Sequence, residues 1–318
     1  MILAIISAIL LIFSFPNFNL SFFVFIGFLP LFLAIKNKSP RRAFLVSYLC
    51  GFLFYLGALY WLYHVTTFGL IILCLYLALY FGIFGFLCAF PLLQRSMISI
   101  PFIWIILEYI QAHLFTGFGW ALLGYSQYKN LPLIQIADFS GVYGVSFVIM
   151  LVNVAVYRAL KRSFRSSVVA LLVLVMVFGY GTAKLKDKEE GKGIKISVIQ
   201  GNIPQHIKWD LDAVGFIMDR FGDLSRAAAL EDPNLIIWPE TSFPGFFASD
   251  RRLTKEVLDL AKKIKTPLLI GANTENGIEI FNSAVLISEN GEIVDKYDKI
   301  HLVPFGEYVP FSHRIPVL

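Results

Sequence analysis

Three ionisable residues in the last third of the chain have types that suit acid–base chemistry. Glu240 follows the apolar run 235–238, and Lys299 and Glu307 share the segment YDKIHLVPFGEYVPF at 297–311. A carboxylate can act as a general base, and an ammonium group can stabilise an oxyanion. Taken singly, each has an ordinary explanation as well: Glu240 as a surface or helix-capping residue, and Lys299 and Glu307 as solvated loop residues.

The elements around these residues have the pattern of an α/β domain. Short apolar runs rich in β-branched residues predict strands, and amphipathic spacing predicts helices between them. The expected strands are 196–200, 235–238, 267–273, 281–287 and 292–297, and the expected helices are 211–230 and 251–264. A layered α/β domain follows from this order. Glu240 then lies in a loop at the carboxyl end of a strand, where such folds carry their chemistry.

The first 183 residues are far more apolar than this domain. The whole chain is 57% hydrophobic and 15% charged, with a mean hydropathy of +0.70, whereas soluble chains carry about 25% charged residues. The predicted membrane spans are 2–15, 20–35, 43–64, 68–93, 97–115, 140–160 and 167–183. We therefore expect a transmembrane domain of about seven helices at 1–183, followed by a second domain at 184–318 that begins in the polar run KLKDKEEGKG.

Basic residues are unevenly divided between the loops that join these spans. One set of alternate loops holds nine of them and the other set holds only Lys129. The nine are Lys36, Lys38, Arg41, Arg42, Arg95, Arg158, Lys161, Arg162 and Arg165. Lysine and arginine concentrate in cytoplasmic loops. The 184–318 domain is therefore expected on the extracytoplasmic side.

Other polar residues give weaker indications. Glu108 and His113 lie near the end of the fifth predicted span; such groups are functional candidates, but side chains that reach toward water are the favoured interpretation here. The loop at 116–139 is rich in aromatic residues and suits either an interfacial or a substrate-facing position. The five histidines show no metal-ligand spacing, so no metal and no cofactor are expected, and nothing supports nucleic-acid binding.

Five segments, in their order along the chain, favour a functional role for the three ionisable residues over a surface role. They are QGNIPQHIKWD, IIWPETSFPG, LLIGANTENG, FNSAVLI and YDKIHLVPFGEYVP. With the apolar spans before them, they make the chain resemble the nitrilase (carbon–nitrogen hydrolase) superfamily and, within it, the apolipoprotein N-acyltransferases. The resemblance implies a multi-pass helical membrane domain followed by an αββα sandwich.

The resemblance also implies roles for five residues. Glu240 would be the general base, Lys299 would stabilise the tetrahedral oxyanion, and Glu307 would be a second glutamate that helps to hold the site. Trp209, in KWD, and Asn282, in FNS, match positions associated with activity or substrate contact. The implied partners are a phospholipid acyl donor, a diacylated apolipoprotein acceptor and the bacterial inner membrane, with the acyl chain carried as a cysteine thioester.

The sequence departs from the family pattern at the nucleophile. The family places its cysteine downstream of the segment that contains Glu307, whereas Cys50, Cys74 and Cys88 all lie in predicted spans. The 184–318 segment is thus expected to be only the N-terminal part of the sandwich. Two alternatives stay open: a membrane protein that binds lipid or lipoprotein without turnover, and a membrane-anchored nitrilase relative that acts on a small amide.

Overall fold

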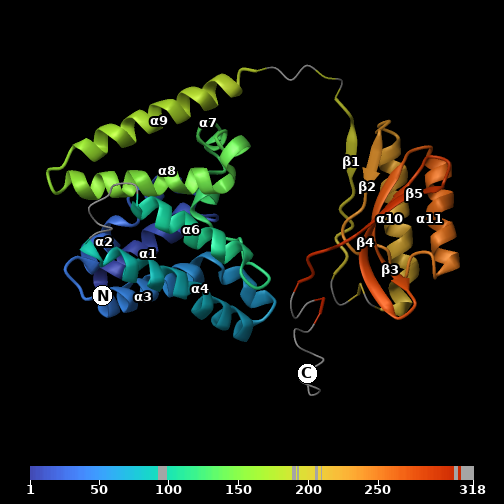
Figure 1. The fold of residues 1–318 in the computed structure, drawn as a ribbon. Helices are drawn as coiled ribbons and strands as arrows, with labels where there is room; N and C mark the ends of the chain where they lie inside the picture. Colours follow the sequence, from blue (N-terminus) through green and yellow to red (C-terminus); the bar gives the residue numbers. More distant parts are fainter. Residues whose placement is uncertain are drawn as a thin grey trace. The chain divides into compact units, whose positions relative to one another are not determined.

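The computed structural model describes residues 1–91, 99–187, 191, 193–204, 207–208, 210–303 and 307–308. The chain divides into two compact units, Met1–Glu189 and Glu190–Leu318. Figure 1 shows that helices build the first unit and that a sheet with helices builds the second.

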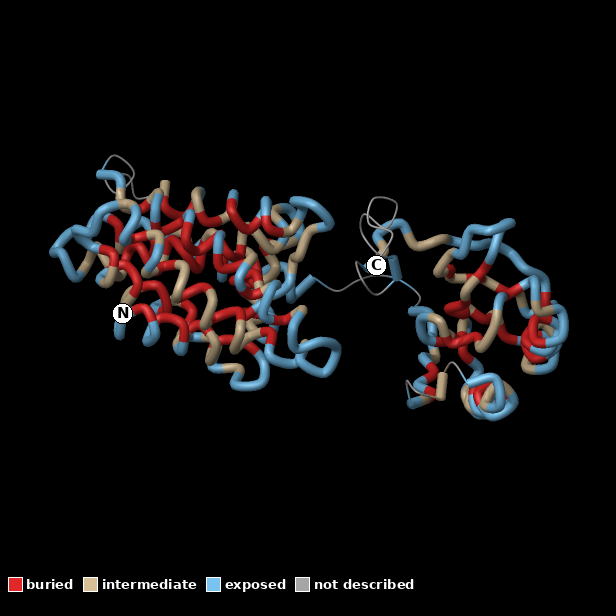
Figure 2. Tube along the Cα trace, turned by 90° about the horizontal axis from the view of Figure 1, so that it is seen from below, coloured by how far each residue is buried: buried red, intermediate tan, exposed pale blue. Residues whose placement is uncertain are grey.

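The first unit is a bundle of helices around an aromatic-rich core. Its α-helices are α1 (Ile2–Ser14), α2 (Leu29–Ile35), α3 (Pro40–Ala58), α4 (Thr67–Cys88), α6 (Ser99–His113), α7 (Leu131–Ile134), α8 (Ala137–Ala159) and α9 (Arg165–Lys184). Short 3₁₀ helices cover Ser21–Phe25, Tyr60–His64 and Leu123–Gln127. At the centre, Trp104 packs edge-on against Phe28, Phe81 and Phe84. Figure 2 shows buried residues along the inner sides of the helices.

All seven predicted spans contain helix, but their lengths differ. Among the described residues, α4, α8 and α9 are the helices long and apolar enough to cross a membrane. Helix α1 has 13 residues, which gives a length of roughly 20 Å against a hydrocarbon core of roughly 30 Å. The predicted span 20–35 is divided between a 3₁₀ helix and the seven-residue α2.

The prediction that Glu108 reaches toward water is wrong. Its side chain is buried, and Oε1 accepts hydrogen bonds from Trp104 Nε1 at 2.9 Å and from the backbone N–H of Leu123 at 2.8 Å. Both donors are themselves buried. The Glu108 carboxylate therefore accepts a hydrogen bond from the start of the 3₁₀ helix at Leu123–Gln127. This helix covers the carboxylate. His113, in contrast, is exposed.

In its described residues, the second unit is built on one five-stranded sheet. Its strands are β1 (Ile196–Val198), β2 (Leu235–Ile237), β3 (Leu268–Asn276), β4 (Glu279–Ile287) and β5 (Ile293–Asp298), in that spatial order. Strands β1, β2 and β3 are parallel, and β4 and β5 extend the sheet as antiparallel neighbours. Helices α10 (Val214–Ala229) and α11 (Arg251–Ile264) are the two crossovers. The structure thus confirms the predicted order of strands and helices.

Period-two alternation decides which side chains of the sheet are buried. Ile236, Leu268, Ile270, Val285 and Ile287 point to one face and form a buried core with α10 and α11. Residues next to these along the strands, such as Ile237, Leu269 and Ala284, belong to the opposite face and are only partly buried. Among the described residues, helices cover only the first face (Figure 1). Of the expected αββα sandwich, the described part is one sheet with one helical layer.

A glycine lets the loop after β2 lie against β3. Gly271 accepts hydrogen bonds from the backbone N–H groups of Ser242 and Phe243 at 2.8 and 3.1 Å. A Cβ at Gly271 would lie 2.3 Å from the carbonyl oxygen of Pro239. No side chain fits at so short a distance from the loop backbone. The glycine at position 271 therefore determines how close the WPET turn, and with it Glu240, lies to β3.

We expect Gly271→Ala to destabilise the second unit by about 1–3 kcal/mol, the usual cost of forcing an atom into a packed site. The clash is with backbone, which cannot rotate away as a side chain can. Urea denaturation followed by hydrogen exchange of peptides from residues 193–303 measures the change. Gly215→Ala on α10 is the matched control, because a Cβ there meets nothing within 4 Å. Equal stability of the two variants would contradict this packing.

Candidate functional site

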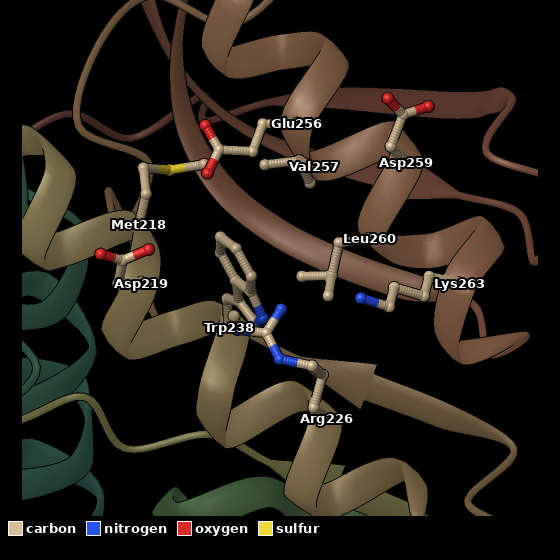
Figure 3. Close-up of a pocket in the computed structure, with 10 residues that line it drawn as sticks. Met218, Asp219, Arg226, Trp238, Glu256, Val257, Asp259, Leu260 and Lys263 are labelled. Carbon is tan, nitrogen blue, oxygen red and sulfur yellow. The ribbon is translucent and has the colours of Figure 1, made fainter.

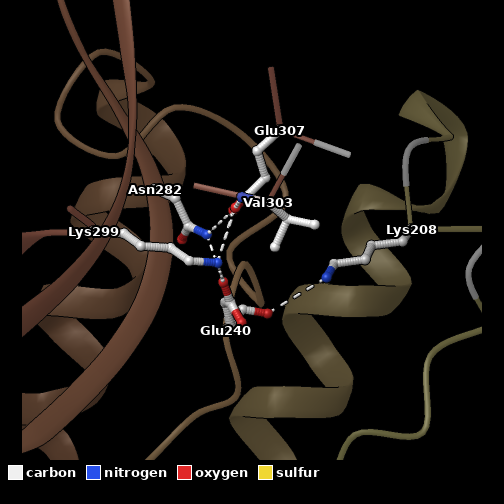
Figure 4. Close-up of polar contacts among 6 residues, drawn as sticks. All are labelled: Lys208, Glu240, Asn282, Lys299, Val303 and Glu307. Carbon is white, nitrogen blue, oxygen red and sulfur yellow. Dashed lines mark hydrogen bonds and ion pairs between the residues drawn. The ribbon is translucent and has the colours of Figure 1, made fainter. Parts of the chain in front are cut away.

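The structure brings four of the five predicted site residues together on the sheet face that α10 and α11 leave uncovered. Glu240 arrives on the loop after β2, Asn282 lies on β4, Lys299 follows β5, and Glu307 follows the next loop. Figure 4 shows their side chains converging from these separate segments. Trp209 lies outside the described residues.

Lys299 is the centre of the cluster. Its Nζ lies 3.0 Å from Glu240 Oε1, and 3.0 and 2.9 Å from the two carboxylate oxygens of Glu307. The side chain of Lys299 is 30% exposed and that of Glu307 25%, whereas Glu240 is 62% exposed. Glu240 is therefore the carboxylate that an incoming reactant can reach, and Glu307 is held behind it.

Asn282 binds both glutamates through one amide nitrogen. Its Nδ2 donates to Glu240 Oε1 at 2.6 Å and to Glu307 Oε1 at 2.7 Å. It occupies the position on β4 opposite Lys299, whose backbone N–H donates to the Asn282 carbonyl at 2.8 Å. The resemblance implies activity or substrate contact for this residue, and in the structure its amide contacts the two carboxylates.

Two hydrogen bonds join Glu307 to Val303. Val303 N–H donates to Glu307 Oε2 at 2.7 Å, and Glu307 N–H donates to the Val303 carbonyl at 2.9 Å. This reciprocal pair turns the Glu307 carboxylate back toward Lys299 (Figure 4). The second carboxylate of the cluster is thus positioned by backbone as well as by charge.

The contacts shift the protonation equilibria in one consistent sense. The pKa of Glu240 is lowered, first by the hydrogen bond from Lys299 and next by that from Asn282. Burial works to raise the pKa of Glu307, but the donors Val303, Asn282 and Lys299 together outweigh it and the net shift is downward. The pKa of Lys299 is raised, chiefly by Glu307. The cluster therefore holds two carboxylates and one ammonium across the neutral range.

Two residues outside the predicted set also support the site. Gly271 allows the close approach of the Glu240 loop, and Lys208 donates from Nζ to the Glu240 carbonyl at 3.4 Å. Lys208 belongs to the segment QGNIPQHIKWD, so its neighbourhood in the sequence was the available signal. For Gly271, the signal was a glycine within a strand, which often marks a close backbone approach.

The cavities of the second unit differ in whether the predicted site residues line them. One of about 260 Å³ is lined by Glu240, Asn282 and Lys299 together with Ile237, Leu269, Ala284 and Tyr297. Another, of about 230 Å³, lies between α10 and α11 around Trp238 and Arg226 (Figure 3) and contains none of the predicted site residues. The first therefore offers an apolar wall beside the charged cluster.

This arrangement suits proton transfer and oxyanion stabilisation next to an apolar surface. Glu240 is an ionised, reachable carboxylate, and the Lys299 ammonium lies within 3.0 Å of it. Among the residues that the structure describes, no three His, Cys, Asp or Glu side chains are grouped to hold a metal ion. The positive charge between Glu240 and Glu307 is the ammonium group of Lys299.

Family models match both units of the chain. Residues 7–155 match the N-terminal domain of apolipoprotein N-acyltransferase, and residues 195–318 match carbon–nitrogen hydrolase. The apolipoprotein N-acyltransferase of Geobacter metallireducens is 40% identical, over 99% of this chain and 66% of its own length. That of Nitrosomonas europaea is 32% identical, over 87% of this chain and 58% of its own length.

The chain belongs to the apolipoprotein N-acyltransferase family. It spans between about three fifths and two thirds of the length of the two relatives just named. Among solved structures, an amidase from Nesterenkonia sp. is similar, with 19% identity, a TM-score of 0.31, and coverage of 37% of this chain and 47% of the amidase.

The cysteines of this N-acyltransferase family member lie in its helical unit. Cys50 is on α3, and Cys74 and Cys88 are on α4; all three are buried and form no disulfide. Each is part of the packed interior of the bundle, with Cys50 and Cys74 wholly inaccessible. All three lie in the apolar segments where the sequence places the predicted spans.

We expect Asn282→Ala to raise the pKa of Glu240, because the variant removes a hydrogen bond that favours the carboxylate. As pH falls, the base form of Glu240 would then be lost at a higher pH than in the unaltered protein. A ¹³C NMR titration of labelled glutamate carboxyls measures this, with Glu240→Gln identifying the signal. Lys255→Gln, on the exposed side of α11, should leave the titration unchanged. An unchanged midpoint in Asn282→Ala would refute the role of this amide.

Proposed function

We propose that this chain carries the general base and the oxyanion donor of an apolipoprotein N-acyltransferase. The reaction moves an acyl chain from a phospholipid to the N-terminal amine of the diacylglyceryl-cysteine of a lipoprotein. The observation that supports it most is the Glu240–Lys299–Glu307 cluster, with Asn282 bridging both carboxylates at 2.6 and 2.7 Å. Membership of the family supports the choice of substrates, and the cluster supports the roles of general base and oxyanion donor.

In the first half-reaction, Glu240 takes the proton of a cysteine thiol, and the thiolate attacks the ester carbonyl of the phospholipid. The family places this cysteine downstream of Glu307. Because a free thiol has a pKa of about 8.5, a neighbouring base raises the fraction of thiolate. Lys299 stabilises the negative charge that forms on the carbonyl oxygen. The carbon–oxygen bond then breaks, the lysophospholipid oxygen takes the proton from Glu240, and a thioester remains.

In the second half-reaction, the lipoprotein amine attacks the thioester carbonyl. The tetrahedral oxygen again carries negative charge beside Lys299, the carbon–sulfur bond breaks, and an amide forms. Glu240 takes the proton that the amine loses and returns it to the departing sulfur. Dividing the transfer into two steps through a covalent intermediate lowers each barrier.

The helical unit is proposed to anchor the site in the bacterial inner membrane, where both substrates are found. Helix α9 exposes Val168, Leu171, Leu172, Val175 and Met176, and large exposed apolar surfaces are unusual on soluble proteins. With α4 and α8, it has the length and composition to cross a bilayer. We further propose that the protein is multi-pass and that its second unit is on the extracytoplasmic side, because of the distribution of basic residues.

Glu240→Gln and Lys299→Ala should each reduce acyl transfer strongly. We expect a loss of about 10²–10⁴-fold without the base and about 10²–10³-fold without the oxyanion donor. The measurement uses the complete product of the gene that encodes this chain, in proteoliposomes with a fluorescent phospholipid and a diacylated lipopeptide. Glu256→Gln and Lys255→Ala, both exposed on α11, are the matched controls. A protein that binds the lipopeptide but transfers nothing, or variants with full activity, would overturn the proposal.

The orientation gives a separate prediction. Alkaline phosphatase, which is active only outside the cytoplasm, should be active when fused after Asp187 and inactive when fused after Lys161. A fluorescent protein that folds only in the cytoplasm should give the reverse result at the same two positions. The opposite pattern would place the second unit in the cytoplasm and away from lipoprotein substrates.

A further inference from the structure

A second polar network lies behind the cluster, on the opposite face of the sheet. Its four residues come from three neighbouring strands: Thr274 on β3, Ser283 on β4, and Lys296 and Asp298 on β5. Side chains alternate between the two faces of a strand. Asn282 and Lys299, which are next in sequence to Ser283 and Asp298, therefore belong to the cluster on the other face. Only strand backbone separates the two groups.

Four contacts close this network into a ring. Ser283 Oγ donates to Asp298 Oδ1 at 2.6 Å, and Asp298 Oδ2 lies 3.1 Å from Lys296 Nζ. Lys296 Nζ donates to Thr274 Oγ1 at 3.5 Å, and the hydroxyl oxygens of Thr274 and Ser283 lie 2.7 Å apart. An ionised carboxylate only accepts hydrogen bonds, so Ser283 gives its proton to Asp298 and Thr274 donates to Ser283. The hydrogen bonds therefore run in one direction, from the ammonium group to the carboxylate.

The carboxylate of Asp298 is the strongest acceptor in the ring. Its pKa is lowered, first by the hydrogen bond from Ser283 and, against the effect of burial, also by Lys296. Asp298 is thus ionised across the neutral range, and hydrogen bonds to ionised groups are roughly twice as strong as neutral ones. Because Lys296 balances its charge, the ring adds no net charge behind the cluster.

The ring is polar where the rest of the same face is apolar. Other buried residues of this face on β3 and β4 are Leu268, Ile270, Ala272, Val285 and Ile287. Thr274 and Ser283 are buried as well. Replacing two buried hydrogen-bonded groups by apolar ones of the same shape is often nearly neutral or stabilising, so stability alone does not account for polar residues here. Hydrogen bonds have a preferred direction, and they therefore fix the positions of the strands more closely than apolar contacts do.

The ring lies where the chain leaves the sheet toward Lys299. Strand β5 is the outer strand of the described sheet, and its pairing with β4 ends at Ser283 and Asp298. The ends of such elements open most easily. The side-chain hydrogen bond between Ser283 and Asp298 therefore ties the last pair of the ladder in addition to its backbone. Any opening there would move the backbone of Lys299, whose N–H donates to the Asn282 carbonyl at 2.8 Å.

We propose that Asp298, held by Ser283, is a positioning residue for Lys299. It fixes the end of β5 and thereby keeps the Lys299 ammonium between the two carboxylates of the cluster. The inference rests on the proposed function for the reaction that Lys299 serves. Asp298 lies on the other face of the sheet and takes no part in proton transfer. A displacement of a reacting group by about 1 Å can cost about 10²-fold in rate, so a residue behind the site affects the reaction through position alone.

The titration midpoint of Glu240 distinguishes positioning from a direct effect of charge. It is measured by ¹³C NMR of labelled glutamate carboxyls on the complete gene product in uncharged maltoside micelles. Removing the negative charge of Asp298 would by itself lower the pKa of Glu240, because like charges disfavour ionisation. Displacing Lys299 would instead raise this pKa, because the carboxylate loses its cation. We expect Asp298→Asn and Ser283→Ala both to raise the midpoint, although neither changes a side chain that contacts Glu240.

Asp295→Asn is the matched control. It removes the same charge from the same strand, and its amide oxygen can still accept the backbone N–H of Lys296, as Asp295 Oδ1 does at 2.8 Å. This variant should leave the midpoint of Glu240 unchanged. A midpoint that is lowered or unchanged in Asp298→Asn, or unchanged in Ser283→Ala, would overturn the proposal. Should Ser283→Ala fail to fold, Asp298→Asn decides alone, because it has the shape of the original residue.

Acyl transfer gives a second readout and separates this inference from the proposed function. Because an oxyanion donor acts in the transition state, Asp298→Asn should lower kcat about 10–10²-fold and leave KM for the lipopeptide nearly unchanged. An unchanged kcat would overturn the positioning role. Raised midpoints in a complete gene product that transfers no acyl chain would overturn only the proposed function. Loss of transfer in Lys299→Ala, together with an unchanged midpoint in Asp298→Asn, would overturn only the positioning role.

Discussion

The cluster of the second unit depends on one ammonium group shared by two carboxylates. Lys299 lies within 3.0 Å of both Glu240 and Glu307, and without it the two negative charges would face each other across Asn282. Like charges at such distances favour protonation of one partner, which would remove either the proposed base, Glu240, or the second carboxylate, Glu307. The pKa of Glu240 is lowered by Lys299 and then by Asn282, and that of Glu307, against the effect of burial, is lowered by the backbone N–H of Val303, by Asn282 and by Lys299, so both carboxylates stay ionised.

That interaction constrains three segments that are far apart in sequence. The Glu240 loop must lie against β3, which the absence of a side chain at Gly271 permits. Asn282 and Lys299 must be neighbours across β4 and β5, which the antiparallel pairing of Ser283 with Asp298 ensures. Helices α10 and α11 stabilise the sheet from one face only, and the cluster occupies the other, beside the partly buried Ile237 and Leu269.

Much of the second unit could be predicted because its signals are local. Helix α11 begins and ends where its amphipathic pattern does, and the strands follow the apolar runs. The sequence alone gave Glu240, Lys299 and Glu307 ordinary explanations, and family resemblance grouped them. The bridging role of Asn282 and the proximity of Lys208 depend on how loops meet in space, which no spacing reveals. The burial of Glu108 could not be predicted, because one of its donors, the Leu123 N–H, comes from a segment that folds back over α6, whereas the other, Trp104, lies one turn earlier on the same helix.

The pairing of β4 with β5 has a consequence for the length of the chain between them. Side chains alternate between the two faces of a strand, so a shift of one residue would move Lys299 to the face covered by α10 and α11. The pairing already contains an irregularity between Leu286 and Ile287, and the turn beyond it includes Gly291 with a φ of 70°. Insertions or deletions of a single residue in the turn between Ile287 and Ile293 should therefore be excluded by the site, although the turn lies at the far end of the hairpin from Asn282 and Lys299.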